Sequence, residues 1–218
     1  MSYVYMKVLE SAPQRYERGM RLLTLGRLER VRQDIAARVM AGQRVLDIGC
    51  GTGTLAASLA GKGAHVIGID IALPMLSQAA HRVREEGLAD RVELRELGAV
   101  NLDTAFQSES FDTVVSVLVF SELSDDEVAY TLAESWRILR IGGQLLIADE
   151  VLPDSVWGRI GTFLLRLPFA VAAFVLTQNT TRQVAGLDAK IARAGFKVAG
   201  TKEYLMGTLR LIVAKKVV

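Results

Sequence analysis

The sequence predicts an α/β protein with a doubly wound, mostly parallel sheet, and three observations support this fold class. Between residues 44 and 150, short apolar runs alternate with amphipathic stretches, as in parallel strands with helices on both faces. The run FDTVVSV at residues 111–117 is apolar enough for a central strand that is buried on both faces. Two β-rich runs after residue 195 lie close enough along the chain to form an antiparallel hairpin at one edge of the sheet.

Each predicted element has ordinary start and stop signals. The expected strands are residues 44–48, 64–70, 91–94, 111–117, 144–149, 196–204 and 208–215. The expected helices begin at Thr54, at Pro74, after a capping box from Ser124 to Glu127, and near Arg182. They end at the glycines of residues 61–63, at Gly87, near Arg140 and at Gly195; Gly142 and Gly143 turn the chain into the fifth strand.

Length and composition predict one globular domain. The chain has 218 residues, of which 50% are hydrophobic and 23% are charged, which excludes disorder, collagen-like repetition and coiled coil. Its single cysteine, Cys50, has no disulfide partner within the chain, and the first residues lack the basic start and apolar run of a secretion signal. We therefore expect a cytoplasmic protein. The longest apolar run, residues 167–176, is about half of the ~20 residues that a spanning helix needs.

Charge is distributed unevenly along the chain. Residues 1–43 carry 8 Lys/Arg against 4 Asp/Glu, residues 44–150 carry 8 against 17, and residues 151–218 carry 10 against 3. Because the basic residues are not clustered with aromatic ones, this pattern is too diffuse for a nucleic-acid interface, and we expect no nucleic-acid partner.

The segment VLDIGCGTG at residues 45–53 and the acid Asp70 carry the chemical signal. A glycine loop that leaves a strand allows a ligand to approach the backbone, and an acid at the tip of the next strand can hold both hydroxyls of a ribose. The loop lacks the G-x-G-x-x-G spacing that presents a helix N-terminus to a pyrophosphate, so the pattern favours a nucleoside without phosphates. Taken singly, the glycines also fit an ordinary strand-to-helix turn, and Asp70 also fits an exposed edge carboxylate.

On these residues the sequence resembles the class I S-adenosylmethionine (SAM) dependent methyltransferases. LDIGCGTG is similar to their first motif, GID to their acidic second strand, FDTVVSVLVFSEL to their fourth-strand segment and LRIGGQLLIADE to their fifth strand. The resemblance implies a Rossmann-like, seven-stranded sheet of order 3-2-1-4-5-7-6 with the last strand antiparallel, and SAM as the cofactor. It also implies an N-terminal helical cap at residues 1–43 and a SAM-binding domain at residues 44–218, which includes an apolar helical insertion at residues 151–181.

The same resemblance assigns the cofactor site residue by residue. Asp70 would take the ribose hydroxyls, Ile71 would lie against adenine, and the glycine loop would lie under the methionine part. The full expected set is Asp47, Gly49, Cys50, Gly51, Thr52, Gly53, Asp70, Ile71, Met75, Ala99, Val100, Ser116 and Val117. One departure concerns adenine, because ELGAVN at residues 96–101 lacks the acid that many relatives have after the third strand. We expect the backbone of Ala99 and Val100 to contact adenine instead.

The sequence says less about catalysis, because methyl transfer from a sulfonium depends mainly on alignment and desolvation. No metal site is expected, and His65 and His81 are interpreted as structural. The candidates for holding or deprotonating an acceptor come from the ends of the fourth and fifth predicted strands, with one tyrosine from the N-terminal cap. The residues at the strand ends fit equally well as a helix cap or as solvated charges at the edge of the site. The candidates are Ser121, Glu122, Asp149, Glu150 and Tyr16. The expected acceptor contacts are Ser121, Trp157, Asn179, Thr180 and Arg182.

The acceptor is expected to be a small, apolar or lipid-like molecule. The amphipathic segment at residues 156–176 fits an apolar acceptor pocket, contact with an anionic membrane surface, or simply the core of the cap. The N-terminal segment is also similar to corrinoid protein-associated methyltransferases, so action with a corrinoid or other carrier protein is an alternative. A SAM-binding regulatory protein without turnover and a nicotinamide dehydrogenase remain rival classes, and the sequence leaves the oligomeric state open.

Overall fold

The computed structural model describes residue 24, residues 26–151 and residues 184–217. Its centre is a seven-stranded sheet of order β3-β2-β1-β4-β5-β7-β6, which confirms the predicted fold class and strand order. The strands are β1 (Arg44–Ile48), β2 (His65–Asp70), β3 (Val92–Glu96), β4 (Phe111–Val117), β5 (Leu139–Glu150), β6 (Phe196–Tyr204) and β7 (Leu209–Lys216). The first five strands are parallel, and β7 runs antiparallel to both β5 and β6.

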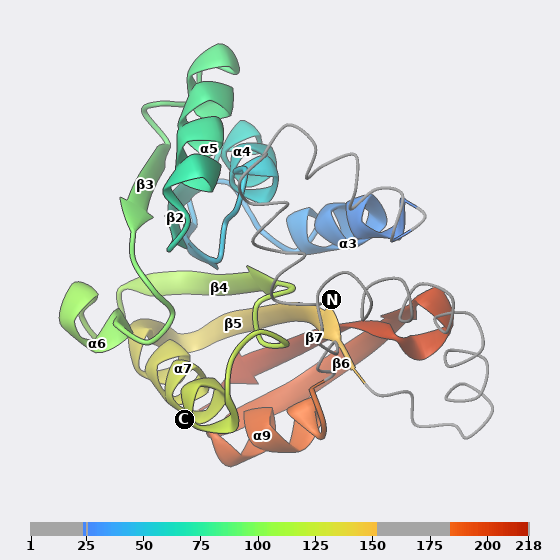
Figure 1. Ribbon diagram of the computed structural model, residues 1–218. Coiled ribbons are helices and arrows are strands. Elements are labelled where there is room, and N and C mark those ends of the chain that lie inside the picture. The colour runs from blue at the N-terminus through green and yellow to red at the C-terminus, as the bar shows by residue number, and fades with distance from the viewer. Residues whose placement is uncertain (1–23, 25, 152–183, 218) are drawn as a thin grey trace.

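Helices cover both faces of the sheet (Figure 1). On one face, α3 (Arg27–Ala36), α4 (Thr54–Gly61) and α5 (Leu73–Glu85) bury side chains against the sheet. On the other, α6 (Leu102–Ala105), α7 (Asp125–Ile138) and α9 (Leu187–Arg193) do the same. The predicted capping box of α7 is confirmed, because the Ser124 hydroxyl accepts from the Glu127 amide and the Glu127 carboxylate accepts from the Ser124 amide.

Two predicted boundaries are wrong by five residues, and the other predicted bounds differ from the observed ones by at most two residues. Strand β5 begins at Leu139 rather than at residue 144, because Leu139 already pairs with Phe111 before the register shifts. Gly143 fits this irregularity since a Cβ there would lie 2.8 Å from the Arg140 carbonyl oxygen. Helix α9 begins at Leu187 rather than near residue 182, because Val184 forms a parallel bridge with Val151. The intervening Gly186 has a left-handed φ of 61°.

Strand β7 joins the C-terminal hairpin to the parallel sheet. Strands β6 and β7 form the predicted hairpin around the short helix η1 (Leu205–Gly207), and only β7 contacts β5 in the ladder. The buried Arg210 of β7 pairs with Asp188 of α9 at 3.0 Å and with Glu203 of β6 at 2.8 Å. These ion pairs hold α9 and β6 to the same strand.

Several expectations fall on residues outside the described ones. They concern Tyr16, Trp157, Asn179, Thr180 and Arg182, together with most of the cap at residues 1–43 and nearly all of the insertion at residues 151–181. No helix in the part of the chain that the structure describes combines the length and apolar character needed to cross a bilayer.

Candidate functional site

The loop between β1 and α4 lies at the carboxyl edge of the parallel strands, where ligands of such sheets bind. The amides of Gly49 and Cys50 both donate to the carbonyl oxygen of Ile69, at 2.8 and 2.9 Å, which ties the loop to β2. Gly49 has a φ of 69°, and a Cβ there would lie 2.2 Å from Val119 Cγ2. Gly51 also has a positive φ, and among the described residues other than its two chain neighbours no heavy atom lies within 4 Å of the position its Cβ would take. The described residues therefore leave room for a ligand at Gly51.

Asp70 connects the tip of β2 to this loop. Its carboxylate accepts from the Gly51 amide at 2.8 Å and from the Ala72 amide at 2.9 Å. Burial raises the pKa of Asp70, although both amide hydrogen bonds act to lower it. Each carboxylate oxygen can accept a further hydrogen bond, so the group keeps the capacity to hold a diol beside the open space at Gly51.

Asp47 lies beneath the loop and is 2% exposed. Its Oδ2 atom is fully buried, and among the described residues it has no hydrogen-bond partner. Burial raises the pKa of Asp47 to about 7, the nearby Arg32 lowers it and Asp70 raises it further. A buried carboxylate with an unpartnered oxygen is complementary to a positively charged group placed against it.

The remaining loop and strand residues of the predicted set have structural partners. Burial, with the neighbouring Asp47 and Asp70, raises the pKa of the Cys50 thiol, which makes a thiolate nucleophile unfavourable. The Thr52 carbonyl accepts from Arg82 Nε at 3.1 Å, and the buried Ser116 hydroxyl donates to the Ile48 carbonyl at 3.2 Å. The other members lie at the same edge: Gly53 is the N-cap of α4, Met75 is buried in the first turn of α5, and Val117 ends β4 half-buried.

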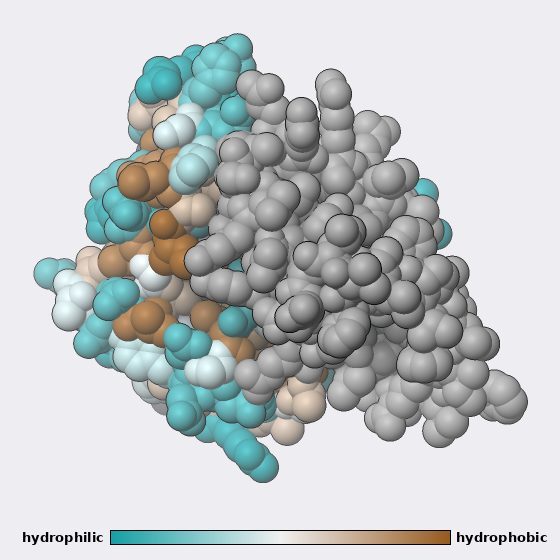
Figure 2. All heavy atoms as spheres, in the orientation of Figure 1, coloured by the Kyte–Doolittle hydropathy of each residue, from teal (hydrophilic) through white to brown (hydrophobic). Residues whose placement is uncertain are grey.

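An exposed apolar surface follows β2 and β3. Ile71 is 74% exposed, and Leu73 and Val100 are exposed as well. Figure 2 shows apolar side chains on this face of the molecule, over the segments that lead to α5 and α6. Exposing such side chains to water is unfavourable, so a ligand that covers them is favoured. The flat face of an aromatic ring is one group that could do so.

A second group gathers where β4 and β5 end. Asp149 is fully buried and accepts from the Phe120 amide and the Glu150 amide, each at 2.7 Å. Burial raises the pKa of Asp149 to about 6, while a hydrogen bond from Ser121 lowers it. Ser121 and Glu150 are therefore brought together around Asp149, whereas Glu122 is exposed. The sequence predicts that Asp149 ends a strand, but it does not predict the hydrogen bonds of Asp149 to the segment that follows β4.

A cavity of about 430 Å³ lies elsewhere, between the end of α3 and strands β6 and β7. Arg38, Gln144, Lys202 and Lys215 are among its lining residues. None of the predicted site residues lines this cavity. Its lining residue Gln144 pairs with Thr113 near the start of β4, so the cavity lies at the amino ends of the parallel strands. The glycine loop and Asp70 therefore lie at the other end of the parallel strands.

Comparisons with known proteins agree with this geometry. A family model described as "Methyltransferase domain" matches residues 45–143. Demethylmenaquinone methyltransferase from Thermobifida fusca is 34% identical over 219 residues, which cover 94% of this chain and 91% of that protein. A solved SAM-dependent methyltransferase from Methanosarcina mazei shares the fold, with a TM-score of 0.66 at 23% identity over 84% of this chain and 97% of that chain.

Two further relatives match a little under 60% of this chain. Methyltransferase GfsG from Streptomyces halstedii is 41% identical over 59% of this chain and 46% of its own length. Phosphatidylethanolamine N-methyltransferase from Cereibacter sphaeroides is 39% identical over 58% of this chain and 61% of its own length. The chain spans about half the length of these two relatives. The full-length likeness to the Thermobifida protein, together with the glycine loop and Asp70, shows that the chain belongs to the class I SAM-dependent methyltransferase family.

Proposed function

We propose that this protein transfers a methyl group from SAM to a small acceptor that is apolar or lipid-like. The observation that carries the SAM site is the glycine loop at Gly51, whose amide donates to Asp70 and which follows the strand of the buried Asp47, an acid with one oxygen that has no partner among the described residues. The relatives named for demethylmenaquinone and phosphatidylethanolamine support an acceptor of the quinone or lipid class.

The residues present fit SAM. The methionine part would lie over Gly51, where its ammonium group is complementary to the Asp47 carboxylate beneath the loop. The ribose hydroxyls would donate to Asp70, and the adenine ring would lie on the apolar surface at Ile71 and Val100. This assignment gives a role to the two acids and to the exposed apolar side chains, whose presence the fold alone does not explain.

When bound, SAM supplies an electrophilic methyl group on a sulfonium sulfur. The task of the protein is then to hold an acceptor atom in line with that methyl group and to exclude water. Asp149 supports this geometry by fixing the Phe120 amide and the Ser121 hydroxyl at the end of β4. In this proposal Glu150, at the end of β5, takes up a proton from the methyl-accepting molecule where one has to be removed.

Titration calorimetry with SAM on wild type and Asp70→Ala tests the cofactor site. Removing a carboxylate that binds a diol costs about 1.5–3 kcal/mol, or about tenfold or more in affinity. The exposed Asp90→Ala serves as the matched control and should bind SAM as the wild type does. Equal affinity of wild type and Asp70→Ala would contradict the assignment of the ribose site.

Turnover is tested separately, with SAM and a set of quinone, phospholipid and hydrophilic acceptors, by following formation of the demethylated cofactor. Methylation of an apolar acceptor supports the proposal. Tight, Asp70-dependent SAM binding without turnover of any acceptor would instead favour a SAM-binding regulatory protein.

A further inference from the structure

The cavity of about 430 Å³ beside α3 is lined by three cations and by no acid. The cations come from three different places in the fold, because Arg38 follows α3, Lys202 lies on β6 and Lys215 lies on β7. Among the described residues, the one carboxylate that pairs with any of them is that of Asp34, which lies 2.7 Å from Lys202 Nζ. Three cations and one acid leave this group with a net charge of +2.

A fourth cation adds to the positive charge at the cavity. Lys197 of β6 is the direct ladder partner of Lys215, so the two exposed side chains leave the same face of the sheet next to each other. Like charges directly opposite one another on neighbouring strands are destabilising. On the other side of Lys215 the ladder partner is the neutral Gln144. An anion bound at this place would therefore offset a repulsion that the described residues do not relieve.

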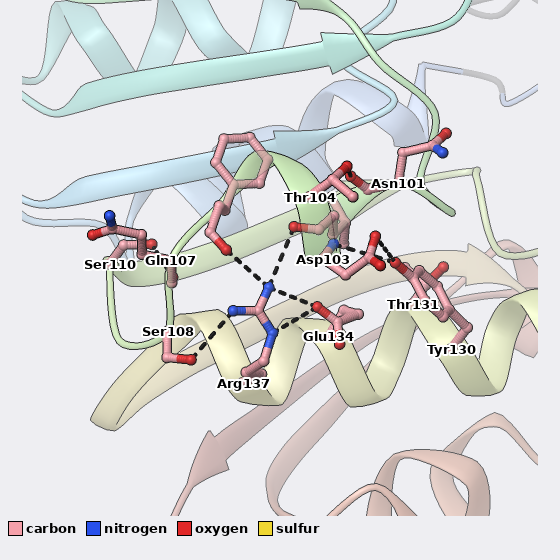
Figure 3. Close-up of polar contacts among 12 residues, drawn as sticks. Asn101, Asp103, Thr104, Gln107, Ser108, Ser110, Tyr130, Thr131, Glu134 and Arg137 are labelled. Atoms are coloured by element: carbon pink, nitrogen blue, oxygen red, sulfur yellow. Dashed lines mark hydrogen bonds and ion pairs between the residues drawn. The ribbon is translucent and has the colours of Figure 1, made fainter.

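Arg137 on α7 shows what a fully paired cation looks like in this protein. Its guanidinium donates to Glu134, to Ser108 and to two backbone carbonyls, at 2.7–3.3 Å. Figure 3 shows these groups converging on the Arg137 side chain. By contrast, neither Arg38 nor Lys215 forms an ion pair within the part of the chain that the structure describes. Their charges are therefore available to a ligand.

The cavity is preformed and has an open floor. The Gln144 amide donates to the Arg38 carbonyl at 2.9 Å, and this bond ties the end of α3 to β5. Gly200 and Val213 are ladder partners that both line the cavity. A Cβ on Gly200 would have no described heavy atom within 4 Å, apart from those of its chain neighbours. A ligand can therefore enter without rearrangement of the backbone, which reduces the cost of binding.

We propose that this cavity binds a phosphate monoester, either a free metabolite or a lipid headgroup, at a site separate from the cofactor site. A phosphate monoester carries about −1.5 to −2 charges at neutral pH and has three strong acceptor oxygens. It thus matches both the net charge of +2 and the three cations that line the cavity from three elements. The guanidinium of Arg38 can also bind two of these oxygens at once.

The bound phosphate monoester is not a methyl acceptor. The cavity lies at the amino ends of the parallel strands, whereas the glycine loop follows the carboxyl end of β1. The five residues of β1 alone span about 16 Å. Because the two sites are separated by at least the length of a strand, phosphate binding does not require SAM. The volume of the cavity, within the range of roughly 300–1,000 Å³ usual for small-molecule sites, leaves room for the group that carries the phosphate.

Titration calorimetry with glycerol 3-phosphate, in a phosphate-free buffer of low ionic strength, tests the site on wild type and three variants. Arg38→Ala/Lys215→Ala removes two of the lining cations. Arg84→Ala/Arg193→Ala removes two exposed cations elsewhere and is the matched control. Gly200→Tyr keeps every charge but places a side chain in the cavity. All these positions are exposed, so a Tm close to that of wild type establishes that each variant is folded.

Wild type should bind glycerol 3-phosphate saturably, with one site per chain. Arg38→Ala/Lys215→Ala should weaken binding about tenfold or more, because charge-assisted hydrogen bonds are lost. Gly200→Tyr should weaken binding to a similar extent, because its ring takes the space of the ligand. The control Arg84→Ala/Arg193→Ala should bind as wild type does, and an excess of S-adenosylhomocysteine should leave the constant unchanged.

A second measurement identifies the source of the phosphate. Co-sedimentation is followed with phosphatidylcholine vesicles that contain or lack phosphatidic acid, whose headgroup is a phosphate monoester. Sedimentation that requires phosphatidic acid and is lost in both Arg38→Ala/Lys215→Ala and Gly200→Tyr assigns a lipid headgroup. Binding of glycerol 3-phosphate without such sedimentation assigns a free metabolite.

Three results would overturn the proposal. The first is a folded wild type that binds neither glycerol 3-phosphate nor the phosphatidic acid vesicles. The second is equal weakening in the lining and control double variants, or binding that survives Gly200→Tyr, because the charges would then act only through the general field of the protein. The third is competition by S-adenosylhomocysteine, which would place the phosphate in the cofactor site.

Discussion

Replacing Asp47 by asparagine should make the ligand-free protein more stable at high pH while weakening its cofactor site. The Asp47 carboxyl is buried, and its pKa is about 7 in the folded chain against an ordinary 3.8. Because the folded value is the higher one, the folded chain binds more protons than the unfolded chain between about pH 4 and pH 7. The contribution of Asp47 to stability is therefore favourable at low pH and is lost as the pH rises through 7.

The size of the effect follows from the same two values. Their difference corresponds to roughly 4 kcal/mol of stability lost on ionisation, at 1.36 kcal/mol for each pH unit. Asparagine removes the charge but buries an amide, which costs about 1–3 kcal/mol where it lacks a partner. We expect a net gain of about 1–3 kcal/mol above pH 7, a rise in Tm of roughly 2–12 °C for a chain of this length.

Thermal unfolding of wild type, Asp47→Asn and the exposed control Asp90→Asn at pH 5 and pH 8, without SAM, measures this gain. Asp47→Asn should melt higher than wild type at pH 8 and no higher at pH 5, and calorimetry should show SAM affinity reduced about tenfold. A Tm difference between Asp47→Asn and wild type that is the same at both pH values would refute the reasoning, because it would not come from ionisation of Asp47.

Three further predictions address the loop, the chemistry and the acceptor. Gly51→Val should abolish SAM binding in calorimetry with a modest fall in Tm, whereas Gly49→Ala should lower Tm more, because its Cβ collides with Val119; the reverse order would contradict an open Gly51 site. Alanine at Ser121, Glu122 or Glu150 should each leave measurable turnover, and loss of all activity at one of them with SAM binding intact would reveal an indispensable base. The sequence of residues 156–181 predicts that the protein co-sediments with anionic vesicles and that the double variant Arg159→Glu/Arg166→Glu does not. A wild type that binds neither neutral nor anionic vesicles, together with a hydrophilic methyl acceptor, would contradict this prediction.

The sequence predicts those parts of the fold that depend on local patterns. Alternating apolar runs and amphipathic stretches locate the strands, and Ser124 with Glu127 locates the start of α7. The start of β5 at Leu139 escapes prediction because it depends on pairing with Phe111 across a register shift. The start of α9 depends in the same way on the bridge between Val184 and Val151.

The site divides along the same line. Asp47, Gly51 and Asp70 can be recognised from the sequence because they lie at the ends of two consecutive strands, at a short and characteristic spacing. The hydrogen bonds of Asp149 give no such signal, because they join the end of β5 to Phe120 and Ser121, about thirty positions earlier in the chain. Only the paired strand ends β4 and β5 bring these residues together.

The position of β7 between β5 and β6 has a consequence for how the chain folds. Until β7 pairs, β5 presents an open row of backbone donors and acceptors, and β6 has no ladder partner, since in the described sheet it pairs only with β7. The pairing of Leu146 with Val213 joins residues 67 positions apart, so it requires closure of a longer loop than the pairing of β1 with β2. A partly folded chain in which β7 has not yet paired exposes the edge of β5 and is open to self-association. Substitutions that weaken the buried Arg210 pairs should increase aggregation during refolding more than they change the cofactor half of the molecule.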